Sequence, residues 1–255
     1  MNDGYSLLPG SERSPLRHWD ARWRLLCLLL LAFAISQVTR VALLPWVALL
    51  TLAILLWSRI PLSAILQRLR YPSLMILAIV ALLPFSVPGD ELWRFSAIAI
   101  TQQGVNAALL VLLRFLAILS LALLFFGVAP LVEHIRAARA LGLPDLIADL
   151  ALLTVRYLEI LRRDLQRMRS ASHLRGDSGR SWRSLFHLIG LTASLLLRSH
   201  ERSARVYQAM RLRGYGLAQP PARLLPPLRS GPRDWGITAW MVTSAATLVL
   251  LELVW

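Results

Sequence analysis

Two segments of the sequence end in the same arrangement of a small residue, an arginine and a glycine. The segments Ala171-Ser172-His173-Leu174-Arg175-Gly176 and Ala209-Met210-Arg211-Leu212-Arg213-Gly214 share the pattern Ala-x-x-x-Arg-Gly and lie 38 residues apart. A Gly directly after a helix adopts the left-handed conformation that closes the last turn, and an Arg there is favoured by the negative end of the helix dipole. Both segments are therefore predicted to be helix ends.

The same residues could also bind a partner protein. A guanidinium carries five donors in a planar fork that pairs bidentately with a carboxylate, and a small residue beside it helps a helix end to enter a groove. Helix capping alone would explain one copy, whereas two copies on similarly built helices suit a two-fold partner whose subunits each receive one end. The candidate docking residues are Ala171, Arg175, Gly176, Ala209, Arg213 and Gly214.

Other residues that could perform chemistry are isolated. No two of the five histidines lie three or four residues apart, and no cysteine lies at ligand spacing from them, so surface or packing roles are expected. They are His18, His134, His173, His187 and His200. The sequence contains no Lys and no Gly-rich phosphate loop, which excludes an ATPase active site. We expect no catalytic, cofactor-binding or metal-binding residue.

Three charged residues leave alternatives open. Arg114 lies within a long apolar stretch, where an ionised group is costly and is either functional or paired within a helix bundle. Asp145 and Asp149 lie one turn apart and could belong to a membrane enzyme that acts on lipid phosphates. Stabilisation of a helix N-terminus is the simpler interpretation of these two acids, because such an enzyme normally needs a larger acidic cluster.

The composition is that of a membrane protein. Of the 255 residues 56% are hydrophobic, and the formal net charge is +14. All 28 basic residues are Arg, a balance that could indicate nucleic-acid binding, but Arg retained on the cytoplasmic side of a membrane explains the charge better. We therefore expect no nucleic-acid partner. Cys27 is the only cysteine, so the chain cannot form an internal disulfide.

The apolar stretches predict an all-α, polytopic membrane protein with about five transmembrane helices. Residues 1–24 form a cytoplasmic tail, residues 25–128 hold four spans, residues 129–233 are cytoplasmic, and residues 234–255 form the last span. The expected spans are two short ones within Leu25–Trp57 that meet near Arg40, then Pro72–Pro88, Asn106–Val128 and Trp235–Trp255. The basic segment 58–71 is expected to be a cytoplasmic loop, and Leu92–Gln103 an amphipathic lead into the fourth span.

The cytoplasmic region is predicted to contain one short helix and two long ones. The short helix covers Pro130–Leu141 and is stopped by Gly142. The long helices run from Pro144, placed in the first turn, to about Leu174, and from Leu185 to Leu212. Each long helix is apolar in its first half and rich in Arg in its second half. Each therefore has a region suited to packing and a region suited to the cytoplasm.

Several stretches of this region resemble the transmembrane T component of energy-coupling-factor (ECF) transporters, and most closely its CbiQ-like branch. They are Leu143-Pro144, Leu152 to Tyr157, Met168 to Gly176, and Arg198 to Tyr215. The resemblance implies that the helix ends with Arg175 and Arg213 dock into grooves of two ABC ATPases. Many members have Ala directly before the Arg, where this chain has Leu174 and Leu212.

The resemblance further implies a non-catalytic, multi-pass subunit of the bacterial inner membrane. Cobalt is the expected substrate, and nickel or a vitamin is the alternative. The implied partners are CbiO-like ATPase subunits and a CbiM-like substrate-binding membrane subunit with a CbiN-like helper. The metal and the nucleotide would bind to these partners, so this chain would need no cofactor of its own.

Overall fold

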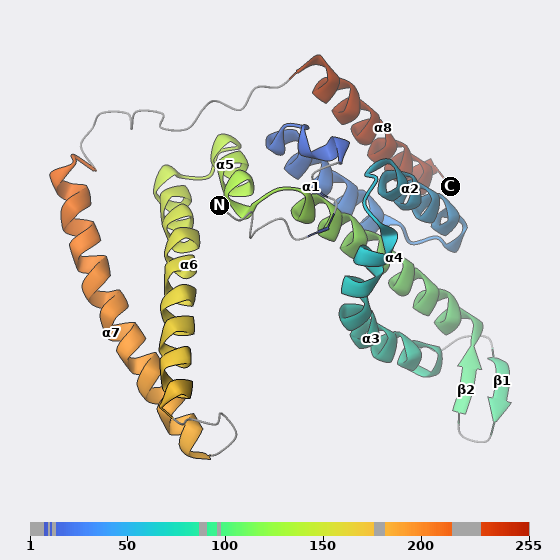
Figure 1. Ribbon diagram of the computed structural model, residues 1–255. Coiled ribbons are helices and arrows are strands. Elements are labelled where there is room, and N and C mark those ends of the chain that lie inside the picture. Colours follow the sequence, from blue (N-terminus) through green and yellow to red (C-terminus); the bar gives the residue numbers. More distant parts are fainter. Residues whose placement is uncertain are drawn as a thin grey trace. The chain divides into compact units, whose positions relative to one another are not determined.

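The computed structural model describes residues 8–9, 11, 14–86, 91–95, 98–175, 182–215 and 231–254. These residues are almost entirely helical, which confirms the all-α prediction (Figure 1). The helices are α1 (Ala21–Gln37), α2 (Leu44–Trp57), α3 (Leu62–Ser86), α4 (Gln102–Val128), α5 (Leu131–Ala140), α6 (Asp145–Leu174), α7 (Trp182–Leu212) and α8 (Pro232–Val254). The chain forms two compact units, one of residues 1–143 with 228–255 and one of residues 144–227.

Among the described helices, α3, α4 and α8 are long and apolar enough to cross a membrane. Two others are shorter, since α1 has 17 residues and α2 has 14. At 1.5 Å per residue they reach about 26 Å and 21 Å, less than the hydrocarbon thickness of about 30 Å. The sequence predicted two short spans in this region, and the helices have the expected length. Leucines on both helices are exposed, as in a surface that meets lipid.

The core of the first unit forms where α1 packs against α4, α5 and α8. Leu31, Ile35 and Leu121 are fully buried there, and the ring of Trp19 meets Phe125 edge to face at 6.0 Å. Because α8 follows the whole second unit in sequence, its place beside α1 is a long-range contact. The Trp19 indole N–H donates to Thr238 Oγ1 at 3.3 Å and fixes one end of this contact.

The other end of α8 is held by an acid that the sequence analysis did not single out. Glu252 accepts hydrogen bonds from the backbone N–H of Thr39, at 3.1 Å, and from the Thr39 hydroxyl. These bonds connect the end of α8 to the segment between α1 and α2. Glu252 lies inside the predicted last span and Thr39 lies in the predicted break between the first two spans, so an acid and a hydroxyl within apolar stretches are the signals that could have paired them.

Helix α3 begins at Leu62, ahead of the expected start at Pro72. The predicted loop 58–71 is therefore wrong, because most of it belongs to this helix. Pro72 lies in the interior of α3 rather than at its first turn, and Pro84 lies near its end. A proline costs one backbone hydrogen bond, and membrane helices tolerate this where neighbouring segments satisfy the freed carbonyl. The Thr101 hydroxyl donates to the carbonyl of Pro84, in the last turn of α3, at 3.3 Å.

The amphipathic lead into α4 is a two-stranded antiparallel hairpin, formed by β1 (Glu91–Phe95) and β2 (Ile98–Thr101). Its strands are rich in aromatic and β-branched residues, which favour strands over helices. The hairpin ends at Thr101, whose hydroxyl accepts the backbone N–H of Gly104 at 3.2 Å and caps α4. The strands thus set the point at which α4 begins.

Gly104 is required for the close approach of α4 to α3. A Cβ at this position would lie 2.8 Å from Pro84 Cα and 2.9 Å from the carbonyl oxygen of Leu83. Since both are backbone atoms, we expect Gly104→Ala to lower the free energy of unfolding by about 1–3 kcal/mol, measured by chemical denaturation in detergent. The matched control is Gly236→Ala in α8, where a Cβ meets nothing within 4 Å. Equal destabilisation of both variants would contradict the close packing.

Candidate functional site

Helix α5 ends and α6 begins as the local sequence signals require. Gly142 has φ of +113°, and its N–H donates to the Arg139 carbonyl at 3.2 Å. The N–H of Leu143 reaches back to the Ala138 carbonyl at 3.0 Å, which completes the closing turn of α5. Pro144 was predicted to lie in the first turn of α6. In the structure α6 begins at Asp145, and Pro144 is the N-cap residue directly before it. The predicted short helix and two long helices are confirmed in these positions.

Helices α6 and α7 form an antiparallel pair. Arg202 Nη2 lies 3.3 Å from Asp164 Oδ2, and the Tyr215 hydroxyl donates to Asp149 at 3.1 Å. Tyr215, just beyond α7, thus meets a residue in the second turn of α6, and Figure 1 shows that the two long helices run in opposite directions. Arg175 lies eleven residues beyond Asp164 and Arg213 lies eleven residues beyond Arg202, in opposite directions along the pair, so the two Arg-Gly ends are separated by roughly 33 Å. The candidate docking ends therefore occupy opposite ends of one hairpin.

The end of α7 has the closing geometry that its sequence predicts. Gly214 has φ of +79°, and its N–H donates to the Arg211 carbonyl at 3.0 Å. The N–H of Tyr215 donates to the Met210 carbonyl, also at 3.0 Å, so the turn is a Schellman motif. Arg213 therefore lies on a rigid turn at the tip of the helix, and its side chain is exposed.

The end of α6 is built in a similar way as far as it is described. Arg175 follows the last helical residue, and its N–H donates to the Ser172 carbonyl at 3.0 Å. Gly176 lies outside the described residues. Ala171 and Ala209, one turn before each Arg, are exposed. Leu174 and Leu212 are each 90% exposed, which is exceptional for leucine and places an apolar side chain beside each guanidinium.

Apolar side chains also line both long helices without being covered inside their own unit. On α6 these are Leu146, Ile147, Leu150 and Leu158, which are at least half exposed. On α7 they are Phe186, Ile189, Leu196 and Leu197, which are exposed to a similar degree. Exposed apolar surfaces of this extent mark contacts with other proteins or with lipid. The pair thus carries charged tips and apolar flanks.

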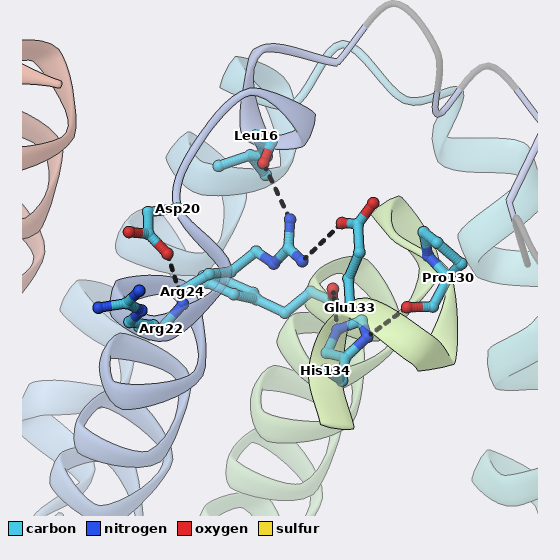
Figure 2. A network of polar contacts seen from close by, with 8 residues as sticks. Leu16, Asp20, Arg22, Arg24, Pro130, Glu133 and His134 are labelled. Carbon is cyan, nitrogen blue, oxygen red and sulfur yellow. Dashed lines mark hydrogen bonds and ion pairs between the residues drawn. The ribbon is translucent and has the colours of Figure 1, made fainter. Parts of the chain in front are cut away.

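A buried polar network holds α5 onto the membrane helices (Figure 2). The Arg24 guanidinium, 1% exposed, donates to the Leu16 carbonyl at 3.2 Å. Its other terminal nitrogen lies 3.9 Å from a carboxylate oxygen of Glu133 on α5. Figure 2 shows the Arg24 side chain between the turn that precedes α1 and the first turn of α5. One side chain thus joins three segments of the first unit.

His134 adds a second link within this network. One ring nitrogen lies 3.2 Å from the Pro130 carbonyl and the other 3.3 Å from the Phe125 carbonyl at the end of α4. A neutral imidazole donates to only one of these carbonyls, whereas an imidazolium could donate to both. Burial, reinforced by the nearby positive charge of Arg24, nevertheless lowers the pKa of His134 below its ordinary value of 6.5. His134 was expected in a packing role, and the structure gives it a hydrogen-bonding one.

Acidification is expected to weaken the attachment of α5. Because the native pKa of His134 is lowered, the unfolded chain takes up a proton first as the pH falls below about 6.5. Stability is then lost as the pH falls from about 6.5 to the lower native pKa of His134. Above about pH 6.5 this group causes no loss of stability. Thermal unfolding in detergent at about pH 7.5 and about pH 5.5 measures the effect. His134→Gln should remove part of the pH dependence, and an unchanged profile would contradict the assignment.

The remaining charged candidates have ordinary surroundings. Asp145 lies in the first turn of α6, and Asp149 accepts the Tyr215 hydroxyl, so neither belongs to an acidic cluster. Within the described part of the chain, no group of three or more His, Cys, Asp or Glu side chains could hold a metal ion. Arg114 is half-buried in the middle of α4, and its Nε has no hydrogen-bond partner among the described residues.

Comparison with known proteins identifies the family. The family model described as "Cobalt transport protein", CbiQ, matches residues 12–222. The chain belongs to the CbiQ family. A curated protein of Thermanaerovibrio acidaminovorans, named "Energy-coupling factor transporter transmembrane protein EcfT", is 28% identical over 254 residues. That similarity covers 94% of this chain and 93% of the relative.

Membership of the CbiQ family confirms the resemblance to the ECF T component. This CbiQ-family chain is accordingly a non-catalytic membrane component of a transporter. The alternative of an enzyme that acts on lipid phosphates is therefore not retained. A T component works together with ATPase subunits and a substrate-binding subunit. The exposed tips and apolar flanks of α6 and α7 are surfaces of the kind that such an assembly needs.

Proposed function

We propose that this chain couples a pair of ABC ATPase subunits to a substrate-binding membrane subunit in a cobalt importer. The observation that carries the proposal is the position of Arg175 and Arg213 on exposed helix ends, at opposite ends of the antiparallel pair α6 and α7. A two-fold ATPase dimer presents two equivalent grooves, so it needs two similar ends that point apart. A single helix end, or two ends side by side, would not meet this need.

The docking residues are Ala171, Arg175 and Gly176 at one end, and Ala209, Arg213 and Gly214 at the other. Each guanidinium enters a groove of one ATPase subunit and pairs with a carboxylate there. The turn at Gly214 supports this role, because a backbone already held by hydrogen bonds loses little conformational entropy when it binds. The exposed Leu beside each Arg adds an apolar contact, where many relatives have only a small residue.

ATP binding closes the ATPase dimer and moves its two grooves. The docked ends of α6 and α7 follow the grooves, and the crossing of the two helices changes. The exposed apolar flanks, which include Leu150 on α6 and Ile189 on α7, pack under the substrate-binding subunit. Their displacement tips that subunit toward the state that releases substrate into the cytoplasm. Energy from ATP thus reaches the substrate site through helix movement, without chemistry in this chain.

Cobalt is the proposed substrate because the family carries the description of a cobalt transport protein. Nickel and a vitamin remain the alternatives, since the substrate would bind to a partner subunit rather than to this chain. The proposed partners are CbiO-like ATPases and a CbiM-like membrane subunit with a CbiN-like helper. The chain would lie in the inner membrane as a multi-pass protein, with residues 1–24 and 129–233 in the cytoplasm.

The decisive experiment is a pull-down of the tagged chain from native membranes, with mass spectrometry of the bound proteins. Cobalt and nickel uptake are measured in the same strain with the gene present and deleted. We expect an ABC ATPase and a small membrane protein in the complex, and loss of cobalt uptake on deletion. Loss of nickel uptake alone would show that nickel, and not cobalt, is the substrate. Absence of an ATPase from the complex would overturn the coupling function.

A further inference from the structure

The ion pair between α6 and α7 joins two positions that the internal repeat makes equivalent. Asp164 and Arg202 are 38 residues apart, the same spacing that separates Arg175 from Arg213 and Ala171 from Ala209. Each member of the pair lies eleven residues before the Arg of its own helix end. The contact is thus made between the same place on two copies of one helical motif.

In a two-fold arrangement, only residues on the axis meet their own equivalents. All other contacts across the axis join different positions of the repeat. Tyr215 and Asp149 are such a case, because they are 66 residues apart and lie far from Asp164 along the pair. The Asp164–Arg202 contact therefore marks the local two-fold axis of the coupling helices. At 1.5 Å per residue, this axis lies about 16 Å from each docking Arg.

The surroundings of the pair suit a fixed point of contact. The side chains of Asp164 and Arg202 are 29% and 35% exposed, so both are partly shielded from water, and their charged atoms lie 3.3 Å apart. Arg202 Nη1 is buried and has no hydrogen-bond partner among the described residues, so the guanidinium is held by Asp164 on one side only. Such a single contact restrains the distance between the helices and leaves their crossing angle free to change.

We propose that Asp164 and Arg202 form the pivot about which α6 and α7 rotate when the ATPases close. This inference rests on the proposed coupling function. A point on the two-fold axis stays in place when two symmetric ends move in opposite senses, whereas contacts away from the axis must open and close. Asp164 and Arg202 are positioning residues, because they fix the distance from the pivot to Arg175 and to Arg213 without touching the ATPases.

The first test compares charge variants in the purified complex reconstituted into liposomes. Asp164→Arg and Arg202→Asp each place like charges at the axis, and we expect cobalt uptake per ATP hydrolysed to fall at least about fivefold, the lower end of coupling between two sites. The double variant with both substitutions restores opposite charges and should restore the ratio. The amount of bound ATPase should remain unchanged in all three, because the docking ends are intact.

The second test links the helices chemically in a Cys27→Ala background. Cysteines at Asp164 and Arg202, joined by a short bis-maleimide, should support uptake, since the distance at a pivot stays constant. Cysteines at Asp149 and Tyr215, joined by the same reagent, should block it. The opposite order, or block by both links, would overturn the pivot. If Arg175→Ala with Arg213→Ala left ATPase binding intact, the coupling function itself would fail, whatever the cross-links showed.

Discussion

Replacing Arg175 and Arg213 together by Ala is expected to abolish cobalt uptake and to remove the ATPase from the purified complex. Truncating one side of a buried, hydrogen-bonded charge pair costs about 2–5 kcal/mol, because the partner carboxylate is left without its counter-charge. Two such losses correspond to a weakening of at least about a thousandfold in the dissociation constant. The measurement is the amount of ATPase that co-purifies with the tagged chain, together with uptake by whole cells.

A matched control separates docking from the loss of positive charge. Arg167 and Arg205 are exposed, lie eight residues before the docking Arg on each helix, and are also 38 residues apart. Replacing both by Ala removes the same charge but should leave ATPase binding within about twofold, as expected for solvated charges. Arg175→Lys with Arg213→Lys should weaken binding, since an ammonium lacks the bidentate fork. Equal effects of the two Ala pairs would contradict docking through Arg175 and Arg213.

Helices α5, α6 and α7 could be predicted from the sequence because the residues that start and end them act locally. Gly142 and Gly214 end α5 and α7 with positive φ, and Pro144 precedes α6 as a residue that cannot continue the preceding helix. Each of these effects is determined by a residue and its immediate neighbours. The start of α3 was missed because Pro72 was expected to begin a span, whereas Pro also occurs inside membrane helices.

The antiparallel direction of α6 and α7 could not be read from the repeat. Two copies of a motif are compatible with parallel or antiparallel helices, and only the contacts of Asp164 and Asp149 decide between them. These contacts join residues 38 and 66 positions apart, beyond the range of helical periodicity. The spacing itself nevertheless held the information, since Asp164 and Arg202 carry opposite charges at equivalent positions. A search of the repeat for complementary pairs would have returned this contact together with Arg163 and Glu201, and the structure pairs Arg163 with Glu159 instead.

The network around Arg24 was missed for a different reason. Arg24 was assigned to a cytoplasmic tail because charged residues near an apolar stretch usually remain in water. Among the residues that the structure describes it is the largest fully buried side chain, with 1% exposed. The sequence analysis did not consider Glu133, the acid in the first turn of α5 that lies beside Arg24. Long-range ion pairs of this kind become visible only when the packing of α5 against α1 is known.

Arg24→Ala is expected to lower the free energy of unfolding by about 3–5 kcal/mol, because truncating a large buried side chain leaves a cavity and removes packing. Arg24→Met keeps most of the stem volume but leaves the Leu16 carbonyl without its donor, which should cost only about 1–3 kcal/mol. Glu133, whose side chain is 40% exposed, remains solvated in both variants. Chemical denaturation in detergent measures the two values.

The difference between the two Arg24 variants decides what the buried side chain contributes. If Met restores most of the stability lost with Ala, packing dominates and the charge is secondary, as expected for a guanidinium whose Nε and Nη2 lack hydrogen-bond partners in the described chain. If both variants lose the same amount, the charge itself holds α5 in place. Arg68→Ala, at an exposed position on α3, is the control and should change stability by less than about 0.5 kcal/mol. In either case α5 is fixed to α1 and α4, so the helix movement that we propose for the coupling function would have to begin beyond Gly142.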